Sequence, residues 1–333
     1  MKILRRWLHQ SSRGSQVRKI LLSLGTVVAV GLLVFQACGK SGPEQRQTGT
    51  TKNQQISVTV GVSLLTRTHP FYQDLEAGLN EAATAAGFKL LITAGEFDVA
   101  RQKDQINDFI VRKVDAIIVA PCDSKSIGTA IKAANDAGIP VFTADIACLA
   151  EGVKVVSHIA SDNVAGGALA AQAVAQALGG SGQVAIIDHP EVESVIQRVR
   201  GFEDELRRHT GIQIVAKLSG RGVKDQAFRT AEDILQAHPD LDAIFGINDD
   251  SALGALAAVE KAGKAGRVRI VGFDAVPEAR AAIKAGKIYA DVVQQPRQIG
   301  LKTIEAVKSY ISGAVVAPTI LIPCTLFAQA DAT

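Results

Sequence analysis

From Ile56 onward, short apolar runs alternate along the sequence with longer segments of helical periodicity. A continuous apolar run suits a strand that is buried on both faces, and such strands alternating with helices indicate parallel sheets covered by helices on both sides. The first unit is typical: Ile56–Val62 predicts a strand, and the helix after it begins near Pro70 and ends at Gly87, a residue suited to a helix C-cap. This alternation predicts an α/β fold.

The same pattern continues through most of the chain. It predicts helices at Ala100–Lys113 and Ser126–Ala137. It predicts further strands at Phe88–Ile92, Ala116–Val119, Val141–Thr143, Val155–Ile159, Val184–Ile187, Ile212–Ala216, Ala243–Gly246, Val268–Phe273 and Ala290–Val293. Roughly a dozen strands exceed what one ordinary open sheet holds, and a length of 333 residues allows two domains. We therefore expect two doubly wound, Rossmann-like parallel-sheet domains.

The N-terminal segment has the features of an export signal. Residues 1–37 carry six Lys or Arg residues and no Asp or Glu, and the apolar run Ile20–Phe35 is shorter than the roughly 20 residues of a membrane-spanning helix. The following Phe35-Gln36-Ala37-Cys38-Gly39 resembles the lipobox of bacterial lipoproteins, which implies a signal peptide at 1–37 and acylation of Cys38. An uncleaved anchor helix is the alternative.

Residues 38–55 are rich in Gly, Ser, Thr, Gln and Lys, so we expect a flexible tether there. These features predict a protein held by a lipid anchor to a membrane, in the periplasm or at the cell surface. Without the first 37 residues the chain has 30 basic and 33 acidic residues, a net charge of −3. That charge lacks the basic footprint of phosphate-backbone binding, so nucleic acid is not an expected partner.

The remaining cysteines are Cys122, Cys148 and Cys324. Cys122 and Cys148 each follow a predicted strand, and these two strands are expected to be neighbours. In an oxidising compartment the two residues pair as a disulfide, or they remain buried thiols. Their spacing fits no zinc site, so we expect no metal.

Motifs of catalysis and cofactor binding are missing from the sequence. It contains no GxGxxG after the first strand, no GxxxxGK[ST] loop, and no HExxH, CxxC or GxSxG motif. The six histidines do not pair at metal-ligand spacing. The sequence thus indicates neither an enzyme nor a bound cofactor.

Polar and aromatic residues follow the predicted strands, at the position where open α/β sheets bind ligands. The residues in these positions are His69, Phe71, Tyr72, Asp145, Arg198, Asn248, Asp274 and Gln294. A polyhydroxylated ligand needs such a mixture, because each hydroxyl both donates and accepts a hydrogen bond and a sugar ring has apolar patches. Taken singly, the two aspartates suit helix caps, Arg198 a solvated charge, and Phe71 and Phe273 the core. Together they favour a cleft.

Several motifs in order resemble the ribose-binding protein family, the type I periplasmic solute-binding proteins that deliver sugars to ABC importers. The resemblance runs from about Ile56 to Pro323. The motifs are His69-Pro70-Phe71-Tyr72, Val156-Ser157-His158-Ile159-Ala160-Ser161-Asp162-Asn163 with Gly166-Gly167, Arg198-Val199-Arg200-Gly201-Phe202, Ala237-His238-Pro239-Asp240, Asn248-Asp249 with Ala252-Leu253-Gly254-Ala255, Val271-Gly272-Phe273-Asp274, and Gln298-Ile299-Gly300.

The resemblance implies the type I periplasmic binding protein fold, with two α/β domains joined by three hinge crossovers. The N-terminal domain would comprise 56–161 plus 295–322, and the C-terminal domain 162–294 plus 323–333. The ligand-contact positions that it implies are His69, Phe71, Tyr72, Asp145, Ser161, Arg198, Asn248, Phe273, Asp274 and Gln294. Ser161 is an additional candidate that is expected near a hinge.

Four positions depart from the ribose binders: His69 and Ala120 each stand in place of an asparagine, Ile146 in place of an arginine, and Gly222 about where an aromatic ring closes over the sugar. The resemblance therefore implies a deoxygenated or larger sugar, a polyol or another small polar ligand as readily as ribose.

We thus expect a monomeric, lipid-anchored solute-binding protein that passes a sugar or polyol to the permease subunits of an ABC importer. A sensor that presents its closed form to a membrane receptor has the same sequence signature. A LacI-type repressor core is disfavoured because an export signal stands where a helix-turn-helix would be. An extracytoplasmic enzyme with the same cleft is a further alternative.

Overall fold

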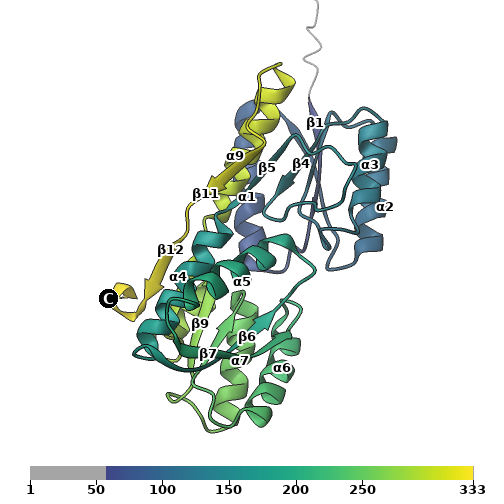
Figure 1. Ribbon diagram of the computed structural model, residues 1–333. Helices are drawn as coiled ribbons and strands as arrows, with labels where there is room; N and C mark the ends of the chain where they lie inside the picture. The colour runs from purple at the N-terminus through teal and green to yellow at the C-terminus, as the bar shows by residue number, and fades with distance from the viewer. Residues whose placement is uncertain (1–57, 333) are drawn as a thin grey trace, which may run out of the picture. The chain divides into compact units, whose positions relative to one another are not determined.

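The computed structural model describes residues 58–332, and the expected signal peptide at 1–37, the acylation site Cys38 and the whole of the tether lie outside them. The described chain forms two six-stranded sheets (Figure 1). The first has the strand order β11-β5-β4-β3-β1-β2, and the second β12-β10-β9-β8-β6-β7.

The strands of the first sheet are β1 (Thr59–Leu64), β2 (Lys89–Ala94), β3 (Ala116–Val119), β4 (Val141–Ala144), β5 (Ser157–Ser161) and β11 (Thr319–Ile322). Those of the second are β6 (Ser181–Asp188), β7 (Gly211–Ser219), β8 (Ala243–Gly246), β9 (Arg269–Asp274), β10 (Ala290–Val293) and β12 (Thr325–Ala328). Neighbouring strands are parallel except for β12, which pairs antiparallel with β10.

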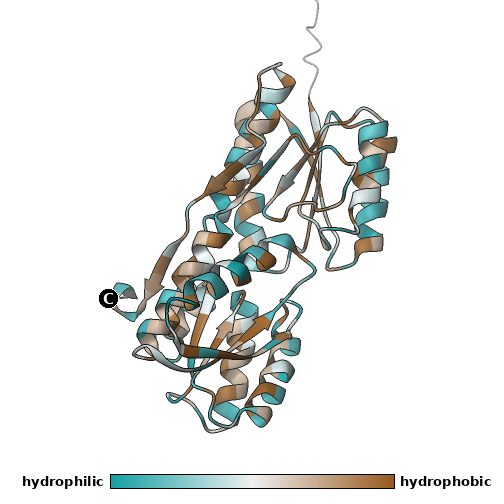
Figure 2. Ribbon diagram, viewed as in Figure 1, coloured by the Kyte–Doolittle hydropathy of each residue, from teal (hydrophilic) through white to brown (hydrophobic). Residues whose placement is uncertain are grey.

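Helices cover both sheets, and each helix buries an apolar stripe against the strands. The helices of the first sheet are α1 (Pro70–Ala86), α2 (Val99–Val111), α3 (Gly128–Asp136) and α9 (Pro296–Ile311). Those of the second are α4 (Asn163–Ala177), α5 (Glu193–Leu206), α6 (Lys224–Ala237), α7 (Asp249–Lys261) and α8 (Pro277–Lys284), followed near the end of the chain by the short 3-10 helix η1 (Gln329–Ala332). We call each sheet with its helices a lobe. In Figure 2 the strands are mostly hydrophobic, whereas α6 alternates hydrophobic and hydrophilic residues.

The chain passes between the two sheets three times: after β5, after β10, and between β11 and β12. The expected class, α/β with two doubly wound parallel-sheet lobes and three crossovers, is therefore confirmed. The predicted strands Ala116–Val119, Ala243–Gly246 and Ala290–Val293 coincide with β3, β8 and β10. Their residues are almost all fully buried, and all but Asp291 are apolar or glycine, which is why an apolar run identified them.

The two C-terminal strands were not predicted. Both β11 and β12 are edge strands of four residues, and Ile322 is the one buried residue of the eight, so neither forms a buried apolar run. Only Pro323 and Cys324 separate them. β12 pairs antiparallel with β10, so the second sheet is mixed rather than wholly parallel as expected.

The disulfide considered for Cys122 and Cys148 is not formed: both residues are free, as is Cys324. Cys122 packs into the cluster shared with α1 and α9, while Cys148 packs against the cluster under α2 and α3. The two thiols thus belong to different parts of the first lobe's core. Burial raises the pKa of Cys122 to about 12, which keeps it a protonated thiol.

Two features are absent from the described residues. Within 58–332, no helix is long and apolar enough to cross a membrane. The same residues contain no group of three or more side chains that could hold a metal ion.

Glycines allow α4 and α5 to approach each other closely. A Cβ atom added to Gly201 would lie 2.0 Å from the carbonyl oxygen of Val164, and one added to Gly167 would lie 2.0 Å from that of Arg198. Both obstacles are backbone atoms, which cannot move aside as a flexible side chain would. This crossing fixes the position of α5 in the second lobe.

We predict that Gly201→Ala destabilises the protein by about 2 kcal/mol or more, because the added methyl group forces the two helices apart. Urea unfolding measures the change. Gln176→Ala, an exposed substitution on α4, is the control and should change stability by less than about 0.5 kcal/mol. Equal stabilities of the two variants would contradict the close crossing.

Candidate functional site

A pocket with about 480 Å³ of space not filled by protein atoms is lined by residues of both lobes. Eight of the ten predicted ligand residues line it: His69, Phe71, Tyr72, Asp145, Arg198, Asn248, Asp274 and Gln294. The other two, Ser161 and Phe273, lie behind lining residues and contact them. The carboxyl ends of the strands thus bring together residues that are up to 225 positions apart in the sequence.

His69 is the N-cap of α1, followed by Pro70 in the first turn. Its Nδ1 accepts a hydrogen bond from the backbone N–H of Phe71 at 3.2 Å, so the neutral ring carries its proton on Nε2. This Nε2 is buried and makes no hydrogen bond with the described residues. It lies 3.7 Å from Oδ2 of Asp274 in the second lobe, which is too far for a hydrogen bond between them.

Asp145 follows β4 and is 97% buried, with a positive φ of 67° that few residues other than glycine adopt. Its Oδ2 accepts a hydrogen bond from the Tyr72 hydroxyl at 2.7 Å, whereas its Oδ1 has no hydrogen-bond partner among residues 58–332. Burial raises the pKa of Asp145 to about 6, and the nearby Arg198 opposes this rise. The pocket therefore contains a carboxylate oxygen that is available to a ligand.

Arg198 extends from α5 and is held on several sides. Its Nε donates to Oδ1 of Asn163 at 2.8 Å, and its Nη1 donates to the carbonyl oxygen of Ile247 at 2.9 Å. The guanidinium lies 4.0 Å from the centre of the Phe273 ring, a cation–π contact. Phe273 is fully buried, so the structure places it under Arg198 rather than in the pocket wall.

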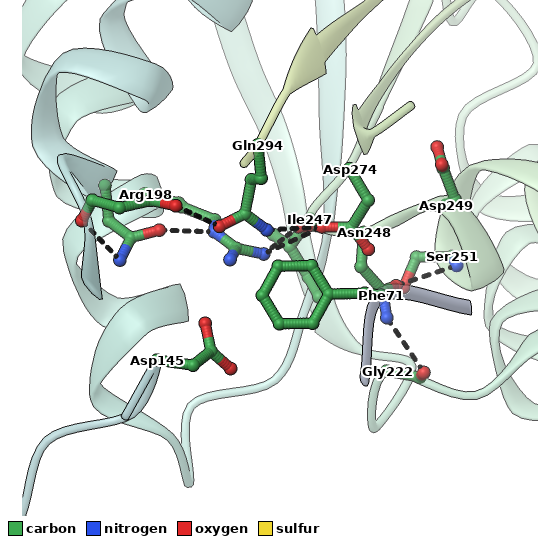
Figure 3. A network of polar contacts seen from close by, with 12 residues as sticks. Phe71, Asp145, Arg198, Gly222, Ile247, Asn248, Asp249, Ser251, Asp274 and Gln294 are labelled. Carbon is green, nitrogen blue, oxygen red and sulfur yellow. Dashed lines mark hydrogen bonds and ion pairs between the residues drawn. The ribbon is translucent and has the colours of Figure 1, made fainter. Parts of the chain in front are cut away.

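Asp274 is the last residue of β9 and has a φ of 118°. Through Gln294 it is connected to the crossings that follow β5 and β10. The amide nitrogen of Gln294 donates to Oδ1 of Asp274 at 2.5 Å, and its amide oxygen accepts from the Ser161 hydroxyl at 2.6 Å. Nη1 of Arg198 is 3.9 Å from the same Asp274 oxygen. Figure 3 shows this network of Arg198, Gln294 and Asp274, with Asp145 and Phe71 beside it.

Asn248 serves both the helix and the pocket. As the N-cap of α7, its Oδ1 accepts from the backbone N–H of Ser251 at 2.9 Å, and its Nδ2 donates to the carbonyl oxygen of Gly222 at 3.0 Å. An amide nitrogen has two hydrogens, so the second remains for a ligand. The helix cap and the ligand contact predicted for this residue are therefore compatible.

The pocket also contains lining residues that sequence analysis did not single out. They are Leu65, Thr66, Phe97, His189, Val192, Ser194, Val195 and Ile247. Phe97 and His189 follow β2 and β6, so the strand-end rule applied to every strand would have found them. Ile146 and Gly222, which depart from the ribose binders, line the pocket, whereas Ala120 is buried outside it.

Behind Asn248 lies a pair of fully buried carboxyl groups, Asp249 on α7 and Asp291 on β10. Asp249 accepts from the backbone N–H of Val276 at 2.6 Å, whereas its Oδ1 and both carboxyl oxygens of Asp291 make no hydrogen bond within residues 58–332. Burial disfavours the charged form of a carboxyl group, and so does a second negative charge nearby. Burial raises the pKa of Asp291 to about 7, and burial together with the neighbouring Asp291 raises that of Asp249.

Comparison with known proteins agrees with this architecture. The chain is 34% identical over 308 residues to the ribose import binding protein RbsB of Bacillus subtilis (strain 168), covering 92% of this chain and 99% of that protein. The Caulobacter myo-inositol binding protein bound to myo-inositol is 31% identical, with a TM-score of 0.77 over 83% of this chain and 94% of that one. An ABC transporter solute binding protein of Agrobacterium vitis with bound D-fucose is also 31% identical, with a TM-score of 0.76 over 82% and 96% of the two chains.

Two α/β lobes with one polar pocket at their strand ends define a two-lobed ligand-binding protein. Residues 60–314 match the family described as periplasmic binding protein domain. The chain belongs to this family, and the predicted resemblance to ribose-binding proteins is confirmed. Membership indicates an extracytoplasmic location.

The Asp249–Asp291 pair predicts that stability depends on pH. Because the pKa of Asp291 is raised to about 7 in the folded protein, its contribution to stability is complete below its unfolded pKa of about 4 and is lost as the pH rises through 7. Asp291→Asn should therefore lose less melting temperature between pH 5 and pH 8 than the unmodified protein, by on the order of a few degrees. Thermal melts across this range measure the difference.

The exposed Asp104 supplies the matched control, and Asp104→Asn should reproduce the pH profile of the unmodified protein. If Asp291→Asn has that same profile, the ionisation of Asp291 does not contribute to the pH dependence of stability.

Proposed function

We propose that this protein captures a sugar or sugar-like polyol in the pocket between its lobes and delivers it to an ABC importer. The observation that carries the proposal is the pair of buried polar atoms that make no hydrogen bond with residues 58–332, Oδ1 of Asp145 and Nε2 of His69. A buried acceptor and a buried donor without partners each cost about 1–3 kcal/mol, and a ligand hydroxyl can satisfy either. A polyhydroxylated ligand satisfies both at once.

Each polar residue of the pocket then has a role. Asp145 and Asp274 accept hydrogen bonds from ligand hydroxyls, while Arg198, Asn248 and His69 donate to hydroxyl oxygens. The relatives named for ribose and crystallised with myo-inositol and D-fucose support this ligand class, because all three compounds carry several hydroxyl groups.

The apolar part of the pocket wall narrows the range of possible ligands further. Ile146, Val192 and Val195 line the pocket and are almost fully buried. Gly222 contributes no side chain, and a Cβ atom added there would lie 3.0 Å from Nδ1 of His189. An apolar wall favours a ligand with a carbon atom that lacks a hydroxyl, so a deoxygenated or larger sugar or polyol is preferred over ribose.

Binding needs no chemical step and no turnover. The ligand contacts residues of both lobes and so stabilises the closed arrangement, which the permease recognises. We propose that the N-terminal domain comprises 56–161 plus 295–322 and the C-terminal domain 162–294 plus 323–333, with hinges at the three crossings. We also propose that the protein is a monomer anchored through acylated Cys38.

A thermal-shift screen tests the ligand class. A ligand at one hundred times its dissociation constant adds about 2.7 kcal/mol to stability, so D-ribose, D-fucose or myo-inositol should raise the melting temperature if it binds. A dye has to report melting, because Trp7 is the only tryptophan of the chain and lies within the expected signal peptide. Amino acids are the control set. A shift with amino acids and none with sugars or polyols would refute the proposal.

Asp274 provides the test of the site. We expect Asp274→Ala and the isosteric Asp274→Asn to weaken binding of the screened ligand by about a hundredfold, since the residue contacts ligand hydroxyls as a buried charged acceptor. Calorimetry measures the affinity, and a thermal melt checks that each variant folds. Asp233→Ala on the exposed face of α6 is the control and should bind as the unmodified protein does. Unchanged affinity in both Asp274 variants would exclude this residue from the site.

A further inference from the structure

The two lobes also touch outside the pocket, where the loop after β3 meets the start of α5. The backbone N–H of Ser124, in the first lobe, donates to the carbonyl oxygen of Glu191 in the second lobe at 3.0 Å. In return, the backbone N–H of Glu193 donates to the Ser124 hydroxyl oxygen at 2.9 Å. Ser124 and Glu193 are 99% and 94% buried, and neither lines the pocket.

Ser124 and Glu193 extend this contact to a second loop of the first lobe. The Glu193 carboxylate faces the backbone N–H of Ala147, two residues after Asp145, which opposes the rise that burial causes in the pKa of Glu193. The carbonyl oxygen of Ser124 accepts from the backbone N–H of Leu149 at 2.7 Å. The start of α5 is thus bonded to the loop that follows β3, and that loop is bonded to the one that follows β4. We call these contacts of Ser124 and Glu193 the interlobe cap.

The local structure of α5 explains why it needs this partner. The first N–H groups of a helix have no acceptor within the helix, and an N-cap side chain usually supplies one. The N-cap position of α5 is Val192, whose side chain has no oxygen and makes no capping bond in the described chain. Ser124 supplies the missing acceptor from the other lobe. The helix that carries Arg198 is therefore capped only when the lobes meet as they do here.

We propose that Ser124 and Glu193 are positioning residues that set ligand affinity without touching the ligand. The inference rests on the proposed function, since it concerns closure of the lobes around the same pocket. The interlobe cap stabilises the closed arrangement and fixes the start of α5, whose Ser194, Val195 and Arg198 line the pocket.

The effect on affinity follows from the closing equilibrium. The apparent dissociation constant rises as the fraction of binding-competent, closed protein falls. Removing the Ser124 hydroxyl leaves the buried N–H of Glu193 without its acceptor in the closed arrangement, whereas water can satisfy that N–H when the lobes separate. The loss therefore favours opening, and we expect about tenfold weaker binding with every pocket side chain intact.

The test compares Ser124→Ala with two matched variants. Ser124→Thr keeps a hydroxyl at the capping position and should restore most of the affinity. Ser126→Ala changes an exposed serine of the same loop, which bonds to Asp123 rather than to the other lobe, and should bind as the unmodified protein does. The probe is whichever of D-ribose, D-fucose and myo-inositol raises the melting temperature of the unmodified protein most, with affinity measured by calorimetry.

Hydrogen exchange gives a second readout that a loss of general stability would not produce. In Ser124→Ala, amide exchange in residues 189–195 should accelerate without ligand, while α1 and α7 exchange as in the unmodified protein. If Ser124→Ala fails to fold, Glu193→Gln weakens the contact with Ala147 and should show the same local acceleration with about threefold weaker binding.

The outcomes separate this inference from the proposed function. Weaker binding together with faster exchange at 189–195 supports the interlobe cap. Unchanged affinity and exchange in the variants overturn it. If none of the three probes shifts the melting temperature, the proposed ligand class fails, and the exchange data alone then decide for or against the interlobe cap.

Discussion

The hydrogen bonds of Gln294 are the interaction on which the rest of the site depends. Gln294 lies where the chain leaves the second sheet, and it joins Ser161, where the chain leaves the first sheet, to Asp274 at the end of β9. An amide can donate at one end and accept at the other, so this side chain satisfies two buried partners. Asp274 in turn lies beside Arg198. Two chain crossings and the charged groups of the pocket are thereby parts of one network (Figure 3).

Burial of carboxyl groups has different consequences in the pocket and in the protein behind it. It is the largest cause of the raised pKa at Asp145, Asp249 and Asp291. Asp249 and Asp291 are fully buried behind the pocket, where burial favours their protonated forms. Asp145 lies in the pocket wall beside Tyr72, and its second oxygen is left for a ligand. The same physical effect thus yields a structural pair in one place and a binding group in the other.

The sequence predicted strands and pocket residues correctly where one short segment contains the whole pattern that indicates them. Continuous apolar runs identified buried strands such as Ala243–Gly246. The rule that ligands bind at the carboxyl ends of strands, together with the family motifs, identified most of the pocket residues. Sequence analysis failed for β11 and β12, whose partly exposed edge positions carry no such pattern. It also missed the role of Ser124, because a serine in a loop after a strand has no feature that shows which helix it caps.

The sequence alone therefore determined the α/β class, the two lobes, the family and the residue types available at the strand ends, since these follow from local periodicity and short motifs. Tertiary structure decided which atoms of those residues remain free. Asn248 and His69 each use one polar atom on their own helix, Phe273 supports Arg198 from below, and Cys122 stays apart from Cys148. These outcomes depend on distances between residues far apart in the chain, and a linear pattern does not contain such distances.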